Sequence, residues 1–288
     1  MANQETQPGT VSKILWHFTG GPKWNSKTNR QAASTKSAAD AFSAFKSILK
    51  SKELRVGSYA ELARVIVPER TRYDREKRDL VTERNVEVLV KSAPVCCLAD
   101  IPIAHLRYHQ RRYGRFAIGF HRQSAVAKGF NPVLYTLEND HLIQSIYQGL
   151  AELRSIDCNS VASIAGEISS FSPDAEFDEL YDLNSLGDEA EGYIGDIENS
   201  VEYSFSQFQK VLAYIKTFSS DEFSTIYCER EWRSLNPFNF SYDDVAMLIL
   251  PHKVGRNSYY AKFIGQQVKR LNLPRRVPVV PWEDLIEH

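Results

Sequence analysis

The fold depends first on the stretch Val11–Thr19, VSKILWHFT, which predicts an opening β-strand that ends at the turn Gly20-Gly21-Pro22. Residues two apart on a strand point to the same face, so His17 and Thr19 would present a ring nitrogen and a hydroxyl side by side. Such a pair suits a ligand with neighbouring hydroxyl or amide groups, such as a ribose or a nicotinamide. The same two residues could equally complete the edge of a strand without binding a ligand.

Helices and strands of uneven length are expected to follow this opening strand. Ser37, ahead of apolar residues at helical spacing, predicts a helix that ends near Lys52, and the charged residues 59–90 are expected to form a helix, a loop and a second helix. Further helices are predicted at 104–113, 123–128, 142–153, 161–168, 203–218 and 258–271, and further strands at 93–103, 115–121, 132–137, 225–232, 244–250 and 276–280. This order favours one α+β domain over residues 11–288, with a split mixed β-sheet and flanking helices.

The composition is that of a globular protein and excludes several functional classes. Hydrophobic residues make up 43% of the 288 residues and charged residues 25%, close to the globular average. The absence of a long apolar run and of a secretory signal predicts a cytoplasmic protein without a membrane span. The four cysteines fit no zinc spacing, and Cys96 and Cys97 are expected to be buried thiols. Kinase, P-loop, Gly-x-Ser-x-Gly hydrolase and zinc-protease motifs are absent.

Charge is distributed unevenly along the chain, although its net value is −1. Thirteen of the 36 acidic residues lie between Ser155 and Gln209, a stretch without Lys or Arg, so the remainder carries 23 acids against 35 basic residues. A positive body with one strongly negative segment suggests a polyanionic ligand, an internal mask over a positive surface, or both. We therefore expect an acidic, partly helical insertion at about 140–209. In the alternative interpretation, its acidic residues only form a solvent-exposed surface and cover nothing.

The sequence Glu229-Arg230-Glu231-Trp232-Arg233 is a candidate for acid–base chemistry. Two carboxylates two residues apart on an extended segment share a face, and their proximity separates their pKa values. One could stay ionised beneath a developing positive charge while the other orients a nucleophile, which the cleavage of a glycosidic C–N bond requires. In the alternative interpretation, Arg230 and Arg233 pair with these acids as salt bridges on the strand surface.

The segment 104–113 predicts a basic helix with two functional interpretations. His105 and His109, four residues apart, would share a helix face as in metal sites, with Asp100 as the nearby carboxylate for a metal-dependent nuclease. The tyrosines and arginines could instead grip phosphates and stack on bases, and a solvated amphipathic helix explains them equally well. The candidate nucleic-acid-binding residues are Arg107, His109, Arg111, Arg112 and Arg115.

Five blocks in order resemble the AbiGi-type abortive-infection family of bacterial phage-resistance proteins. They are Trp16–Thr19, Cys97–Pro102, His109–Phe120, Asn131–Tyr135 and Glu229–Arg233. The blocks cover roughly residues 14–137 and 210–250, and the acidic stretch between them looks like a variable insertion. Because members are described as antitoxins of abortive-infection systems, the resemblance implies phage defence and a partner protein from a defence operon.

A more distant similarity links the chain to ADP-ribosyltransferases, whose cores commonly begin with His-x-Thr on a strand and carry Glu-x-Glu on a late strand. This similarity implies that His17 binds the nicotinamide ribose of NAD, that Glu231 stabilises the ribosyl cation and that Glu229 steers the acceptor. The implied cofactor-binding residues are His17, Thr19, Gly20, Asp100 and Tyr113. Tyr108, Tyr113 and Tyr135 compete for the family's middle tyrosine.

Two functions therefore stay open. The first is an ADP-ribosyltransferase-like enzyme of phage defence that cleaves NAD and modifies a nucleic acid or a protein. The second is a non-catalytic antitoxin or nucleic-acid-binding module whose acidic segment, Glu167–Glu202, covers a basic surface. The enzyme requires His17 and Glu231 to converge on one cleft.

Overall fold

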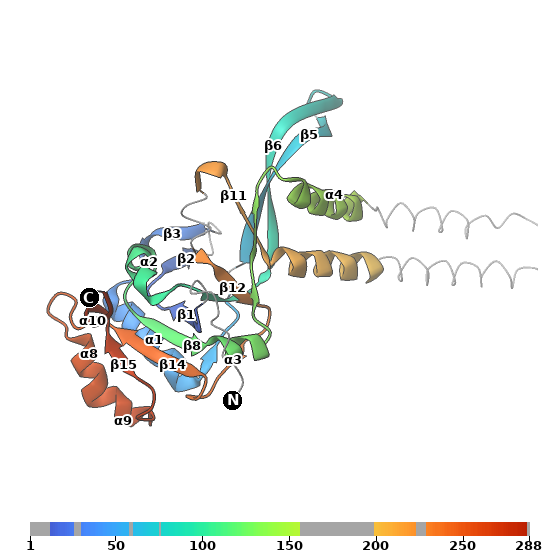
Figure 1. Cartoon of the computed structure of the whole chain (residues 1–288). Helices are drawn as coiled ribbons and strands as arrows, with labels where there is room; N and C mark the ends of the chain where they lie inside the picture. The colour runs from blue at the N-terminus through green and yellow to red at the C-terminus, as the bar shows by residue number, and fades with distance from the viewer. Residues whose placement is uncertain are drawn as a thin grey trace, which may run out of the picture. The chain divides into compact units, whose positions relative to one another are not determined.

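The computed structural model describes residues 12–25, 30–57, 60–74, 76–155, 199–222 and 229–286. The chain divides into two compact units (Figure 1). Unit 1 comprises Met1–Ala60, Pro94–Tyr135 and Ser219–His288, and unit 2 comprises Glu61–Ala93 and Thr136–Phe218. The single domain predicted from the sequence stays a prediction, as does its acidic insertion, most of which lies outside the described residues.

Unit 1 is built on a mixed sheet of seven strands in the order β15-β14-β8-β1-β7-β12-β9. In chain order these strands are β1 (Ile14–Phe18), β7 (Cys96–Ala99), β8 (Ala117–His121), β9 (Asn131–Pro132), β12 (Glu231–Ser234), β14 (Val245–Leu250) and β15 (Val279–Pro281). All neighbours for which the register is given are antiparallel except β14 and β15, which run parallel. The predicted α+β class with a mixed sheet is thereby confirmed.

Helices cover both faces of this sheet. Successive residues of β1 point to opposite sides, so neighbouring residues pack against different helices. Leu15 belongs to a core cluster with Phe42 and Phe45 of α1 (Ala38–Ser51). Its neighbour Trp16 belongs to a second cluster with Leu106 of α2 (Leu106–Tyr113) and Trp282 of α10 (Trp282–Ile286). The α1 face and the α2 face are named after these helices below.

Short elements complete unit 1. They are β2 (Pro22–Asn25) with β3 (Arg30–Thr35), β4 (Glu53–Leu54) with β13 (Phe238–Asn239), η1 (Ile103–His105), α3 (Arg122–Ala127), η2 (Ser220–Glu222), α8 (Tyr259–Lys262), the π-helical η4 (Phe263–Gln267) and α9 (Val268–Arg270). The helix predicted from Ser37 is confirmed: the Ser37 hydroxyl accepts a hydrogen bond from the Asp40 amide at 3.1 Å and caps α1.

Unit 2 contains the long hairpin of β5 (Ala60–Asp74) and β6 (Asp79–Pro94), which corrects the helix–loop–helix expected at 59–90. Alternate residues Ala63, Val65 and Val67 are buried, a period of two that favours a strand. Their partners come from α4 (His141–Ser155), from a helix at 199–212 and from β11 (Ile215–Phe218), which pairs with β10 (Leu134–Leu137). The helix predicted to run to 218 therefore ends earlier, and its last residues form β11.

Other predictions have mixed outcomes. The remaining helices and strands are found near their expected positions, except that the helix at 161–168 and the first half of the strand at 225–232 lie outside the described residues. Cys96 is buried as expected, Cys97 is partly exposed, and Cys158 and Cys228 are not described. Within the described residues, no helix is long and apolar enough to cross a membrane.

Candidate functional site

The end of β1 holds the first group of predicted site residues. The Thr19 side chain is 2% exposed, and its hydroxyl donates a hydrogen bond to the Ala41 carbonyl of α1 at 2.9 Å. The His17 ring is partly buried, with Nδ1 at 3.2 Å from the Cys97 carbonyl oxygen of β7. Both polar side chains are thus used to join the strand to its neighbours.

Gly20 lies at a close approach between two backbone segments. A Cβ atom at Gly20 would lie 2.8 Å from the Tyr113 carbonyl oxygen and 3.2 Å from the Gly114 Cα. Gly114 has a positive φ of 78° at the end of α2, a conformation that suits glycine. The two glycines let the end of β1 meet the end of α2, which explains the Gly20 identity without a ligand.

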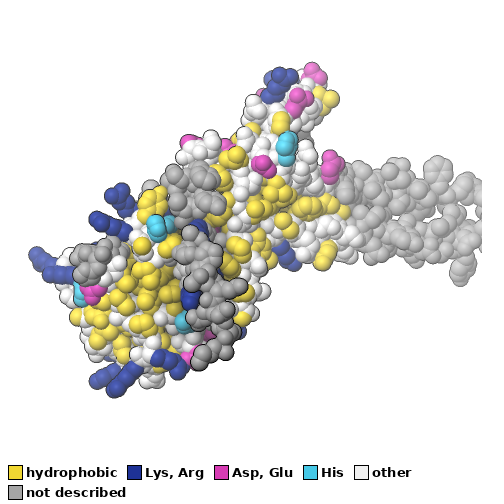
Figure 2. Space-filling view, in the orientation of Figure 1, with side chains coloured by type: hydrophobic (Ala, Val, Ile, Leu, Met, Phe, Trp, Pro, Cys, Tyr) yellow, Lys and Arg dark blue, Asp and Glu magenta, His cyan; other side chains and the backbone are white. Residues whose placement is uncertain are grey.

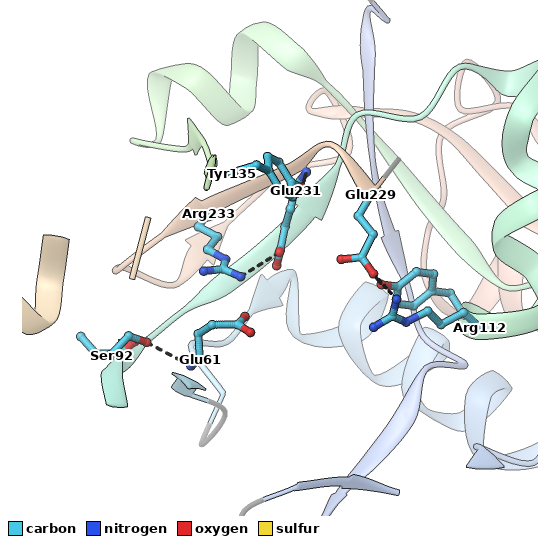
Figure 3. A network of polar contacts seen from close by, with 9 residues as sticks. Glu61, Ser92, Arg112, Tyr135, Glu229, Glu231 and Arg233 are labelled. Atoms are coloured by element: carbon cyan, nitrogen blue, oxygen red, sulfur yellow. Dashed lines mark hydrogen bonds and ion pairs between the residues drawn. The ribbon is translucent and has the colours of Figure 1, made fainter. Parts of the chain in front are cut away.

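The buried carboxylate of Glu229 binds two side chains of α2. Its Oε1 accepts a hydrogen bond from the Tyr113 hydroxyl at 2.9 Å and forms an ion pair with Arg112 Nη1 at 2.5 Å. Figure 3 shows Glu229 directed towards Arg112, on the same side of β12 as Glu231. The Tyr113 ring stacks on Phe18 at the end of β1, with a centroid distance of 5.7 Å. Glu229, Arg112 and Tyr113 therefore form one network on the α2 face.

Glu231 binds a second cation, Arg233, whose side chain is fully buried. Arg233 Nη2 donates to Glu231 Oε2 at 2.8 Å, and the Glu231 amide donates to the Tyr135 hydroxyl at 2.7 Å. Burial is also the main reason why the pKa of the Cys97 thiol is raised, and the negative charge of Glu231 adds to it. The salt-bridge interpretation predicted for Glu231 and Arg233 is confirmed, but the pair lies inside the protein.

Arg230, between the two glutamates, adopts a positive φ of 41° and pairs with Asp100. Its Nη2 lies 3.0 Å from Asp100 Oδ2, and its carbonyl accepts a hydrogen bond from the Asp100 amide at 2.9 Å. Burial raises the pKa of Asp100, an effect that the charges of Arg230 and Arg122 oppose. The left-handed residue interrupts the regular strand, which explains why Glu229 reaches α2 while Glu231 stays on β12.

The strand register separates His17 from Glu231. Ala99 of β7 is the cross-strand partner of both Trp16 and Glu231, and cross-strand partners share a face of a sheet. Glu231 therefore belongs to the α2 face with Trp16, whereas His17, one residue further along β1, alternates to the α1 face. Tyr113 lies with Glu229 on the α2 face, so the residues expected to hold NAD are distributed over both faces of the sheet.

The basic helix α2 presents only part of its predicted set to solvent. Arg107 and Arg111 are exposed, and Tyr108 is 56% exposed. His109 is buried under the helix, Arg112 pairs with Glu229, and Arg115 pairs with Glu283 of α10 at 3.0 Å. No group of three or more His, Cys, Asp and Glu side chains is arranged to hold a metal ion within the described part of the chain.

A family model described as "Putative abortive phage resistance protein AbiGi, antitoxin" matches residues 60–273, about three quarters of the chain. The chain belongs to the AbiGi family. This match confirms the resemblance seen in the five sequence blocks. No curated protein and no solved structure matches the chain, so the ADP-ribosyltransferase similarity has no support from a neighbour.

Two histidines, the partly buried His17 and the buried His109, should make this AbiGi protein sensitive to acid. Burial lowers the pKa of His17 and of His109 below 6.5, against the opposing effects of the Cys97 carbonyl and of Glu229. Below pH 6.5 the unfolded chain therefore binds protons that the folded chain does not, so the free energy of unfolding falls as the pH falls, by at most about 1.4 kcal/mol per pH unit for each histidine.

Denaturant unfolding followed by tryptophan fluorescence at pH 7.5 and 5.5 checks this expectation, because all four tryptophans belong to unit 1. His17→Asn should reduce the loss of stability at the lower pH, and the same change at the exposed His121 should leave it as in the wild type. An equal loss in His17→Asn and the wild type would contradict the assignment to His17.

Two contacts at the candidate site of the AbiGi protein were not predicted from the sequence. Glu229 and Tyr113 are 116 residues apart, and no local pattern reports such a pairing. The sequence predicts Asp100 in a cofactor site and Arg230 as a partner of the glutamates, whereas in the structure the two residues bind each other. Arg230 stands between the two glutamates in the sequence, so only the three-dimensional structure shows that it pairs with Asp100 instead.

Proposed function

We propose that this AbiGi-family protein is an antitoxin of an abortive-infection system that acts by binding a partner toxin, without a reaction of its own. The strand register at Ala99 carries the proposal: it assigns Glu231 and His17 to opposite faces of the sheet. The two groups that would have to act on one N-ribosyl bond therefore have no common site. The family description, which names an antitoxin, supports the same function.

The polar partners of the candidate residues support this proposal. Glu229 is held by Arg112 and Tyr113, Glu231 by Arg233, and Asp100 by Arg230. A carboxylate held by a cation is less available to a reacting group. The contacts of Glu229 and Asp100 join α2 and the end of β7 to the segment that precedes β12.

A second candidate function is ADP-ribosyl transfer from NAD, which one observation favours. Glu229 and Glu231 lie on the same side of β12 in Figure 3, and Tyr113 lies at Glu229. In this function the bond between the ribose C1′ and nicotinamide breaks, nicotinamide leaves, and a bond from C1′ to the acceptor forms as the acceptor gives up its proton to solvent. Glu231 would stabilise the ribosyl cation and Glu229 would orient the acceptor on the α2 face, whereas His17, on the α1 face, would take no part in this site.

Two measurements on the full chain separate these functions. Co-expression with the toxin of the same system should restore bacterial growth for the wild type and equally for the double variant Glu231→Gln, Arg233→Met, which removes the carboxylate without leaving the buried Arg233 unpaired. Incubation of the purified protein with NAD should release no nicotinamide. Failure of the wild type to restore growth would reject the antitoxin, and nicotinamide release that a folded double variant lacks would establish the enzyme instead.

A further inference from the structure

The C-terminal part of unit 1 contains a long run of one charge sign. Between Asp244 and Glu283 there is no acidic residue, whereas seven basic residues occur. They are Lys253, Arg256, Lys262, Lys269, Arg270, Arg275 and Arg276. All seven are exposed, and they lie on α8, on α9 and on the segments before and after them. We call this surface the C-terminal basic arm.

Almost all of these positive charges are available to a ligand. Arg276 pairs with Asp243, and the other six make no ion pair with a described residue. The neighbouring acids of α10 are already bound: Glu283 accepts from Arg115 and from the His252 amide, and Asp284 pairs with His252. The arm therefore carries a net positive charge that the described residues do not neutralise.

The helical part of the arm separates its apolar and basic residues. Tyr259 and Phe263 are buried in the core on the α1 face, where Val268 and Leu271 also pack. The exposed side carries Lys262, Gln266, Lys269 and Arg270 at helical spacing. This side therefore groups three cations on one exposed surface, opposite the apolar residues. In Figure 2, Lys and Arg side chains stand out at the lower left, where Figure 1 shows α9.

We propose that the C-terminal basic arm binds the phosphate backbone of double-stranded nucleic acid. A group of unneutralised Lys and Arg side chains matches the regular negative charge of a duplex and displaces its counterions. The inference goes beyond the antitoxin function and does not depend on it. It also differs from the predicted binding by α2 and the residues that follow it, where Arg112 and Arg115 are used in ion pairs.

The side chains of the arm favour a duplex over other polyanions. Single-stranded nucleic acid is bound through exposed aromatic rings, but the Tyr260 ring packs against His252 and its hydroxyl donates to the Val279 carbonyl at 3.4 Å. An anionic membrane requires an apolar stripe beside the cations, and Ile264, 41% exposed, is the one large exposed apolar residue described between 251 and 282. Contacts to the phosphate backbone alone predict binding without sequence preference.

The test is binding of the full chain to labelled 20-base-pair duplexes, one of DNA and one of RNA, measured by fluorescence anisotropy at 50, 100 and 200 mM NaCl. The triple variant Lys262→Gln, Lys269→Gln, Arg270→Gln should bind on the order of 100-fold more weakly at 100 mM salt. Loss of three phosphate contacts should also lower the slope of log K against log salt by about 2.7. Comparison of the two duplexes identifies the preferred source of the phosphates.

A matched control removes the same charge elsewhere. Lys77→Gln, Arg78→Gln, Lys91→Gln on the exposed side of the β5–β6 hairpin should leave both the affinity and the slope nearly unchanged. Equal binding by the arm variant and the wild type would overturn the proposal, as would a wild-type protein that binds neither duplex at 50 mM salt. Tighter binding to single strands, or binding only to phosphatidylserine vesicles, would overturn it too.

Discussion

Replacement of Arg233 by methionine should lower the free energy of unfolding of unit 1 by about 3–5 kcal/mol, because it leaves the charge of Glu231 in the interior without its cation. The Arg233 side chain is fully buried, and its Nη2 lies 2.8 Å from Glu231 Oε2. Methionine keeps much of the side-chain volume, so the loss reports the charge more than a cavity. Denaturant unfolding followed by tryptophan fluorescence measures it, since all four tryptophans are in unit 1.

A double-mutant cycle shows whether the loss arises from this pair. Addition of Glu231→Gln to Arg233→Met should recover much of the lost stability, because the uncompensated charge is then gone. The exposed pair of Arg55 and Glu53, at 3.1 Å, is the matched control, and Arg55→Met should cost less than about 1 kcal/mol. A cost of that small size for Arg233→Met would show that the buried pair is not important for stability.

Replacement of Gly114 by alanine should cost about 2–4 kcal/mol of stability for two reasons. The φ of 78° and ψ of −167° belong to a region that is nearly exclusive to glycine, and the new Cβ would lie 3.2 Å from the Gly20 Cα. Thermal and denaturant unfolding of unit 1 measure the cost.

Gly129 is the matched control for Gly114. Its φ of 82° is similar, but a Cβ at Gly129 would meet nothing within 4 Å. Gly129→Ala should therefore cost only about 1 kcal/mol, the ordinary penalty of a positive φ. If the two variants lose the same stability, the contact between the ends of β1 and α2 is not the constraint that fixes Gly20 and Gly114.

The fold was predictable wherever the signal was local. A capping serine and apolar residues at helical spacing identify α1, and Gly114 marks the end of α2. The β5–β6 hairpin was misassigned because its exposed outer half is highly charged, which hides the buried alternation of Ala63, Val65 and Val67. Their burial depends on α4 and the helix at 199–212, which are distant in sequence.

The residue types of the candidate site could be predicted from the sequence, but most of the side chains that bind them could not. The spacing of Glu231 and Arg233 indicated their pairing, whereas Glu229 lies before the strand, beyond the left-handed Arg230, where the argument from an extended segment does not apply. The sequence could not reveal that β7 lies between β1 and β12, which determines the face on which each residue lies. Nor could it reveal that Arg233 lies between Cys97 of β7 and Asn131 of β9, with its side chain fully buried.

Unit 2 is built from two segments of the chain, Glu61–Ala93 and Thr136–Phe218, and in each of them a residue near the first end is hydrogen-bonded to one near the last. The Glu61 amide donates to the Ser92 hydroxyl at 3.0 Å, and the Glu138 amide donates to the Phe218 carbonyl at 3.1 Å. The two ends of each segment are therefore held close together. For a flexible loop whose ends are held in this way, doubling the number of residues raises the entropic cost of closure by only about 0.6 kcal/mol. The acid-rich residues 156–198 lie within the second segment, so a change in their number or identity can be accepted in evolution while the strand order of the seven-stranded sheet is preserved.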